Sequence, residues 1–188
     1  MKKLILILCL ILLPTSLHAW GVVGMCGGTP AAGGGCATQT KNTSAEVDNG
    51  NEEVSSDTTL GQSFTTSAFG GGTKEIHRII LRIAAVTSGG TMTLRFDNDT
   101  DMSSEYTVQI QQAYTGTGEI TFTFAEPRPT VSQSTVYYFF VQNSGNCTVD
   151  YDVDAAYAGG SLYFAWSQTW TPSIDVGTDA WFQVFLCD

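Results

Sequence analysis

The chain has 188 residues, of which 43% are hydrophobic and 14% charged, and its net charge is −10. A chain of this length can bury enough apolar surface to form a single domain with its own core. The acidic balance argues against nucleic acid and anionic membrane surfaces as partners, because both repel a negatively charged protein. Cations, neutral glycans and basic proteins remain compatible with it.

Residues 1–19 have the layout of a secretory signal peptide. Lys2 and Lys3 form a positive start, residues 4–13 form an apolar run, and Ala19 places a small residue at the cleavage position. The apolar run is shorter than the roughly 20 residues that span a bilayer. We therefore expect a secreted or cell-surface protein with no membrane span after cleavage. An uncleaved anchor is the alternative.

Residues 20–57 precede the first strong strand pattern. Gly27-Gly28 and Gly33-Gly34-Gly35 are followed by a polar run over residues 41–57. Such composition is typical of a flexible segment. We expect the folded domain to occupy residues 58–188.

Four cysteines lie beyond the leader: Cys26, Cys36, Cys147 and Cys187. Export permits disulfides, and four cysteines allow three pairings. We favour a local Cys26–Cys36 bridge and a Cys147–Cys187 bridge that ties a late strand to the last one. Zinc is the alternative, but there is no CxxC motif, and His77 is the only histidine beyond the leader.

Short segments of alternating apolar and polar residues fill the rest of the chain. The clearest places Met92, Leu94 and Phe96 on one face. A period of two predicts half-buried strands, whereas residues 136–141 are apolar on both faces and predict a central strand. Nine strands are expected, at residues 62–66, 76–83, 91–96, 106–110, 120–124, 136–141, 148–153, 162–166 and 182–186.

Glycine-rich and Asn-rich turn signals separate these segments, and no amphipathic helical stretch interrupts them. This pattern predicts an all-β protein in which two antiparallel sheets pack as a β-sandwich of about eight or nine strands. An outer-membrane barrel fits less well, because its strands need about 10 residues with an outward apolar band.

From residue 60 onward the order of features resembles a family of sandwich domains in secreted bacterial and phage surface proteins, some of them known as choice-of-anchor domains. The matching segments lie at residues 62–64, 79–83, 121–124, 134–138, 157–160, 170–171 and 179–185. The resemblance implies a jelly-roll-like sandwich, an extracellular location, and a role in attachment or recognition. It implies no catalytic residues.

An acidic loop is a candidate calcium site. Asp97, Asp99 and Asp101 alternate, and Glu105 follows them. Carboxylates in this spacing can converge on calcium, which takes six to eight oxygen ligands. The EF-hand pattern is only half met, because Met102 replaces the glycine of the sixth position. The alternative is a solvated hairpin loop in which Asp and Asn stabilise the turn.

A second acidic run places Asp150, Asp152 and Asp154 at alternate positions of an expected strand. Their carboxylates would share one face and repel one another unless a cation or water screened them. Two interpretations of these residues remain open: they form a second calcium site, or they lie on an exposed face of the sheet.

Aromatic residues gather near Gly159-Gly160. Trp170, Tyr163 and Tyr157 are candidates for glycan contact, since flat rings suit the C–H faces of sugars. The alternative is that such rings fill the core, because large aromatic side chains dominate core energetics.

No catalytic constellation is recognisable. His77 has no nucleophile motif such as GxSxG beside it, and no P-loop is present. We expect a non-catalytic binding or surface-attachment module that is directed at carbohydrate, with calcium as the candidate cofactor. The alternative is a self-associating structural subunit of an extracellular appendage or surface layer.

Overall fold

The computed structural model describes residues 37–42, 50–56, 58–98, 108–152, 157–166, 173–175 and 178–188. The chain divides into two compact units, residues 1–33 and 34–188, and every described residue belongs to the second. The described ranges form strands and connections, with no helix that would be long and apolar enough to cross a membrane.

The larger of two sheets has eight strands. Its main path runs in the order β1 (Ala37–Asn42), β14 (Phe182–Cys187), β4 (Thr73–Ser88), β10 (Asn146–Asp152) and β13 (Asp179–Ala180). Three more strands join from the sides: β2 (Gly50–Val54) pairs with β10, while β7 (Gly118–Thr123) and β8 (Thr130–Ser132) pair with β4. The long strand β4 therefore organises this sheet.

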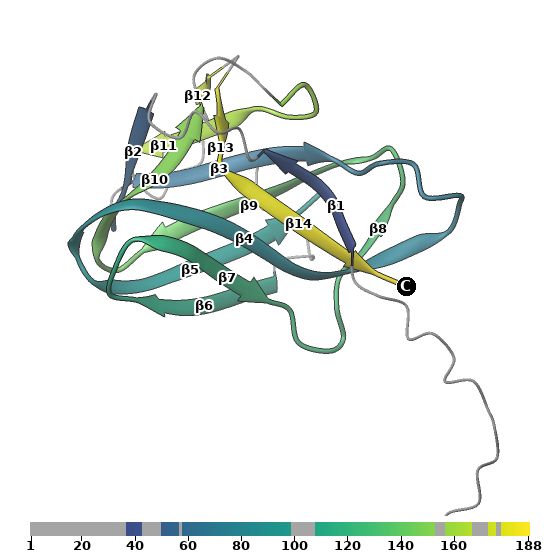
Figure 1. Ribbon diagram of the computed structural model, residues 1–188, viewed down its shortest axis with the longest axis horizontal. Coiled ribbons are helices and arrows are strands. Elements are labelled where there is room, and N and C mark those ends of the chain that lie inside the picture. The colour runs from purple at the N-terminus through teal and green to yellow at the C-terminus, as the bar shows by residue number, and fades with distance from the viewer. Residues whose placement is uncertain are drawn as a thin grey trace, which may run out of the picture. The chain divides into compact units, whose positions relative to one another are not determined.

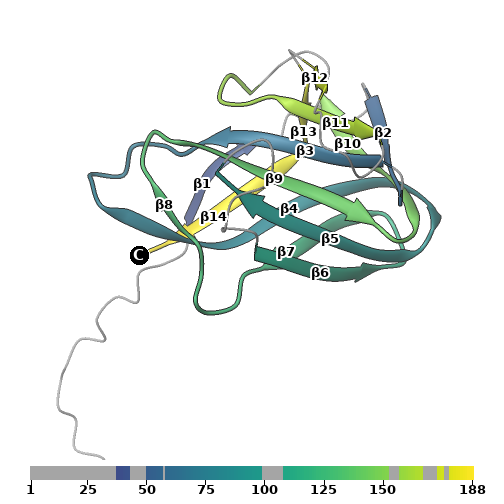
Figure 2. The same ribbon diagram turned by 180° about the vertical axis from the view of Figure 1, so that it is seen from behind.

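The smaller sheet has six strands. Their order is β12 (Ser173–Asp175), β11 (Leu162–Trp166), β3 (Thr58–Thr65), β9 (Val136–Asn143), β5 (Gly90–Asp97) and β6 (Val108–Tyr114). The apolar strand β9 lies between β3 and β5, as its composition predicts. Figure 1 shows β14, β4 and β7 of the larger sheet toward the viewer, and Figure 2 shows β9 and β5 of the smaller sheet from behind.

The core lies between the two sheets and consists of the inward residues of the alternating strands. Met92, Leu94 and Phe96 of β5 are at most 1% exposed. Aromatic rings join the layers: Phe182 of the larger sheet lies 6.3 Å from Phe64 and 5.6 Å from Phe139, measured between ring centroids. Edge-to-face and tilted contacts of this kind add to the stabilisation that apolar burial provides.

The structure confirms the all-β, antiparallel sandwich. All described strand pairs are antiparallel, and each of the nine expected strands overlaps an observed one. The described residues contain fourteen strands, more than the eight or nine expected, because short strands are added at the sheet edges. Two of these, β1 and β2, precede residue 58 and belong to the larger sheet.

Candidate ligand-binding pocket

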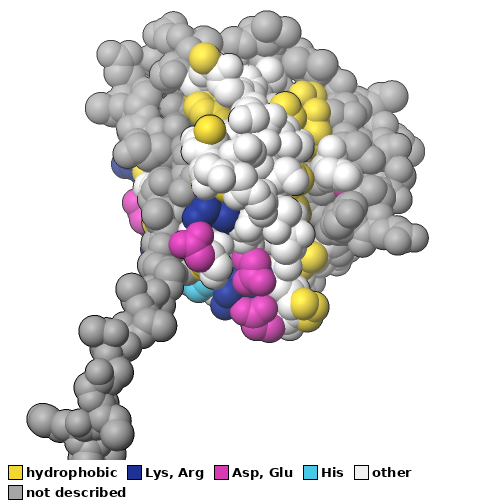
Figure 3. Space-filling view, turned by 90° about the vertical axis from the view of Figure 1, so that its right-hand side faces the viewer, with side chains coloured by type: hydrophobic (Ala, Val, Ile, Leu, Met, Phe, Trp, Pro, Cys, Tyr) yellow, Lys and Arg dark blue, Asp and Glu magenta, His cyan; other side chains and the backbone are white. Residues whose placement is uncertain are grey.

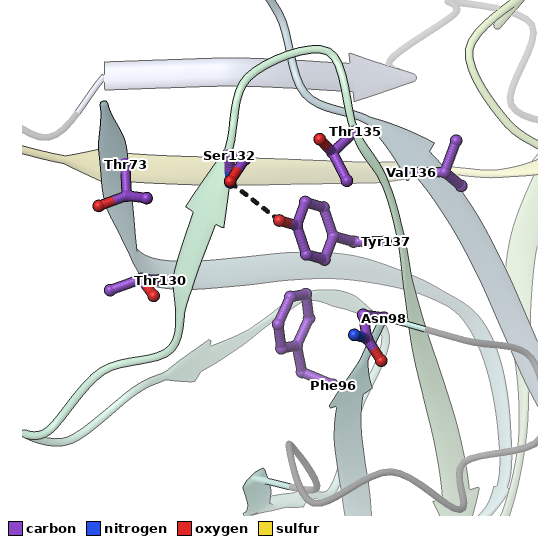
Figure 4. A pocket seen from close by; sticks show the side chains of 8 residues that line it. All are labelled: Thr73, Phe96, Asn98, Thr130, Ser132, Thr135, Val136 and Tyr137. Atoms are coloured by element: carbon purple, nitrogen blue, oxygen red, sulfur yellow. Dashed lines mark hydrogen bonds between the residues drawn. The ribbon is translucent and has the colours of Figure 1, made fainter. Parts of the chain in front are cut away.

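A pocket of about 270 Å³ lies at one end of the sandwich, between β8 and the adjoining ends of β4, β5 and β9. This is close to the lower limit for small-molecule sites, which favours a ligand of about one ring. Figure 4 shows the side chains around it. The lining residues are Thr73, Phe96, Asn98, Thr130, Ser132, Thr135, Val136 and Tyr137.

Two stacked aromatic rings form the apolar part of the pocket. The rings of Phe96 and Tyr137 lie 5.6 Å apart between centroids, at an interplanar angle of 24°. The backbone N–H of Ser132 donates to the Tyr137 hydroxyl at 2.8 Å, the contact drawn in Figure 4. Both rings belong to the core and are nearly buried, at 1% and 8% exposure, so they form a fixed floor of which only a small part is accessible to a ligand.

The polar wall is held in place by Thr66, at the end of β3. The Thr66 hydroxyl donates to the Ser132 carbonyl at 2.6 Å and accepts from the Thr135 N–H at 3.1 Å. The Ser134 N–H donates to the Thr66 carbonyl at 3.0 Å. These bonds fix the turn between β8 and β9, so the pocket wall is formed before any ligand binds.

The pocket is electrically neutral. None of its eight lining residues is charged, and most carry a hydroxyl or an amide. Figure 3 looks onto the end of the molecule where β8 lies: charged side chains gather in the lower part of this face, and side chains that are neither hydrophobic nor charged, together with backbone, cover most of the described remainder. Arg128 forms ion pairs with Glu126 at 2.8 Å and with Glu75 at 3.4 Å.

The predicted calcium ligands are only partly described. Asp97 closes β5 and is fully buried, and its Oδ1 accepts from the Asn98 N–H at 2.6 Å. Asp99, Asp101 and Glu105 lie outside the described residues. Within the described residues no group of three or more His, Cys, Asp or Glu side chains is placed to hold a metal. The calcium site therefore stays a prediction.

Of the predicted aromatic ligands, Tyr163 and Tyr157 lie within the described residues, and both pack against other rings. Tyr163 is 7% exposed and packs edge-on against Tyr138 at 5.8 Å. The Tyr157 hydroxyl accepts from the Thr65 N–H at 3.1 Å, and its ring packs edge-on against Phe182 at 5.3 Å. Both rings serve in packing, and Trp170 lies outside the described residues. The sequence does not single out Phe96 and Tyr137 as pocket residues, because alternation assigns Phe96 to the core and residues 136–141 are apolar on both faces, so Tyr137 does not differ from its neighbours.

The predicted Cys147–Cys187 disulfide is wrong. Cys147 is a fully buried free thiol, whereas Cys187 is disulfide-bonded. Cys147 pairs with Val86 at one end of β4, and Cys187 pairs with Glu75 at the other end. At about 3.3 Å per residue these positions are on the order of 30 Å apart, far beyond the reach of a disulfide.

The acidic run of β10 contains an ion pair between a buried carboxylate and a partly exposed arginine. Asp150 is 3% exposed, and its Oδ2 lies 3.1 Å from Nε of Arg82, on the neighbouring strand β4. The side chains of Asp152 and Asp154 lie outside the described set. Asp150 is therefore compensated by a protein cation, and an exposed sheet face is not its environment.

Comparison with known proteins supplies the fold alone. No family model matches the chain, and no curated protein matches its sequence. A solved structure similar to it is that of the cysteine protease and lectin-like domains of Cwp84, a surface layer associated protein of Clostridium difficile. The TM-score is 0.50 at 9% identity, over 70% of this chain and 32% of that one. The chain thus spans about a third of that protein's length.

Proposed function

We propose that this protein is a secreted, non-catalytic module that binds carbohydrate and thereby attaches to surfaces. The observation that carries the proposal is the pocket, in which stacked aromatic rings meet a wall of hydroxyl and amide groups. A sugar ring has the complementary surface, because its C–H faces are apolar and its rim consists of hydroxyl groups. Preformed pockets with a few oriented polar groups are the usual form of small-ligand sites.

The composition of the pocket favours a neutral sugar and binding without catalysis. Apart from Tyr137, whose hydroxyl is held by Ser132, no lining side chain is an ordinary acid or base. Glycoside hydrolysis takes a pair of carboxylates across the scissile bond, and the lining offers none.

The sequence and the structural neighbour support the proposed location. Residues 1–19 have the layout of a signal peptide. The similar solved structure belongs to a protein described as surface layer associated, and it includes a lectin-like domain. Both agree with a role outside the cell.

The proposal is tested by screening the protein, expressed with its leader and purified after secretion, on a glycan array and on insoluble polysaccharides. Each screen is run with calcium and again with a chelator. We expect saturable binding to a neutral sugar. Loss of binding in chelator would support the calcium prediction, since Asn98 of the pocket directly follows Asp97. No binding in either condition would contradict the proposal and favour the structural-subunit alternative.

Substitution of two exposed lining residues tests whether this pocket is the carbohydrate-binding site. The double variant Asn98→Ala, Thr130→Ala should weaken binding about tenfold, because each hydrogen bond to a neutral group contributes roughly 0.5–1.5 kcal/mol. Thr117→Ala, in the exposed turn between β6 and β7, is the matched control and should bind normally. Isothermal titration calorimetry with the sugar found in the screen measures the effect. Equal affinities of the double variant and the control would exclude this pocket.

A further inference from the structure

The outer face of the smaller sheet carries a cation, Arg95, for which the described residues provide no ion-pair partner. Met92, Leu94 and Phe96 of β5 point into the core, so Thr91, Thr93 and Arg95 point outward. Arg95 is half-buried on this face, directly opposite Phe140 on β9 and Gln109 on β6.

The other basic side chains that the structure describes are compensated or stacked. Lys74 pairs with Asp188, Arg82 with Asp150, and Arg128 with Glu75 and Glu126. Arg78 lies 4.1 Å from the centroid of the Phe185 ring. Within this set Arg95 is the cation with neither an ion pair nor a ring stack, in a protein whose net charge is −10.

A neutral partner orients the Arg95 guanidinium. The Gln109 side-chain amide is oriented with its oxygen, not its nitrogen, toward Arg95. In this orientation the oxygen accepts hydrogen bonds from Arg95 Nε at 3.0 Å and from Arg95 Nη2 at 3.2 Å. A guanidinium has five N–H donors, so the remaining ones all lie on the terminal nitrogens. Gln109 thus fixes the plane of the group without neutralising its charge, and the terminal nitrogens can form paired hydrogen bonds with a planar anion.

A polar depression adjoins this cation. It has a volume of about 250 Å³, and its lining includes Thr91, Thr93, Gln111 and Gln142. Thr93 is paired with Gln111 on one side and with Gln142 on the other, one row of the sheet away from Arg95. Rows on one face of a strand are about 7 Å apart, a distance that one sugar ring with a carboxylate substituent spans.

We propose that this face is a second binding site, for a sugar bearing a single carboxylate on an otherwise neutral glycan. The carboxylate pairs with the terminal nitrogens of Arg95, and the ring hydroxyls bond to Thr93, Gln111 and Gln142. The net charge of the protein repels polyanions, whereas the local charge of Arg95 attracts one carboxylate. The site lies on a different surface from the neutral pocket and does not depend on the proposed function.

The test compares two sugars that differ only at one carbon, methyl glucuronoside and methyl glucoside. Each is titrated into ¹⁵N-labelled protein while backbone amide shifts are followed by NMR. We expect the glucuronoside to bind at least about tenfold more tightly, as one charge-assisted hydrogen bond implies, and to shift the amides of Thr93, Arg95 and Gln111. Equal affinity for the two sugars, or no saturable shift with the glucuronoside, would overturn the proposal.

Three variants identify the responsible side chain. Arg95→Gln should abolish the preference for the charged sugar, while Arg95→Lys should keep part of it, because an ammonium retains the charge but not the planar pair of donors. Arg78→Gln makes the same charge change on the larger sheet and should behave as wild type. The dispersion of the amide spectrum shows whether each variant is folded. If Arg95→Gln still prefers the glucuronoside over the glucoside, Arg95 is not the residue that binds the carboxylate. Changes in the backbone amide shifts of Asn98 and Ser132 report separately on binding in the neutral pocket.

Discussion

Gly61 and Phe140 lie directly opposite each other on β3 and β9, and the aromatic ring lies across the glycine. A Cβ atom at position 61 would be 2.4 Å from Cδ1 and 2.5 Å from Cε1 of Phe140. Since Phe140 is 1% exposed, its ring has little free space to move into. The absence of a side chain at residue 61 therefore allows a large aromatic side chain to be buried on the outer face of this sheet.

We expect Gly61→Ala to lower the free energy of unfolding by about 1–3 kcal/mol, the usual cost of overpacking. Urea denaturation followed by tryptophan fluorescence measures the change. The control is Gly116→Ala, because a Cβ there has no heavy atom within 4 Å. The explanation fails if both substitutions have the same small effect.

At the scale of the element, the strands that the sequence predicts are those whose residues alternate between core and solvent. In β5 and β14 every second residue is buried, so the period is visible in the sequence alone. β8 and β13 have three and two residues, too few to show a period. β1 and β2 are mainly polar in sequence, and their place is set by backbone pairing with β14 and β10, which are distant in the chain.

The pocket could not be predicted for a related reason. Its residues come from four strands and two connections: β5 and β9 contribute apolar and aromatic residues, the other segments contribute an ordinary Thr, Ser or Asn, and none of them lies in a recognisable motif. Arg95 likewise has the appearance of any outward residue of an alternating strand. That no described carboxylate pairs with it is evident only when the partners of the other cations are known.

Gln62 joins the two sheets through the core. Although fully buried, it donates from Nε2 to Oδ1 of Asp179 at 2.7 Å, and its Oε1 accepts from the Ala180 N–H at 2.8 Å. These bonds connect β3 of the smaller sheet to β13 of the larger one. A buried amide is stable here because its donor and its acceptor are both satisfied.

We expect Gln62→Leu to destabilise the protein by on the order of 2–4 kcal/mol, because the buried Ala180 N–H and the Asp179 carboxylate each lose a partner. Gln111→Leu makes the same chemical change at an exposed position of β6 and should leave the stability almost unchanged. Calorimetric melting of both variants provides the comparison. A melting temperature for Gln62→Leu equal to that of Gln111→Leu would show that the inter-sheet bonds contribute little.

At the scale of the whole molecule, the first described strand pairs with the last. Ala37 of β1 is opposite Leu186 of β14. Cys187 is disulfide-bonded and Cys147 is free, so the partner of Cys187 is a cysteine outside the described residues. We expect it to be Cys36, which precedes Ala37 in the sequence, in place of the Cys26–Cys36 bridge favoured from the sequence alone. Cys147 is surrounded by core groups: Asn143 Nδ2 lies 3.4 Å from its sulfur, and burial raises the pKa of the thiol. A protonated, buried thiol is unreactive toward alkylating agents.

Non-reducing peptide mapping by mass spectrometry tests this arrangement. We expect a cross-linked peptide containing Cys36 and Cys187, together with alkylation of Cys147 only after denaturation. Cys147→Ala should leave the cross-link intact, while reduction should destabilise the fold by about 2–5 kcal/mol. A peptide joining Cys147 to Cys187 would contradict the register of β4, β10 and β14.

The position of β14 has a consequence for how the molecule acquires its fold. β14 lies between β1 and β4, so the middle of the larger sheet is completed by residues 182–187. Contacts between such distant parts of a chain form slowly, because a long loop has to close first. The middle of the larger sheet therefore cannot form while residues 182–187 are still being synthesised, so this part of the fold is acquired late, after most of the chain has already been made.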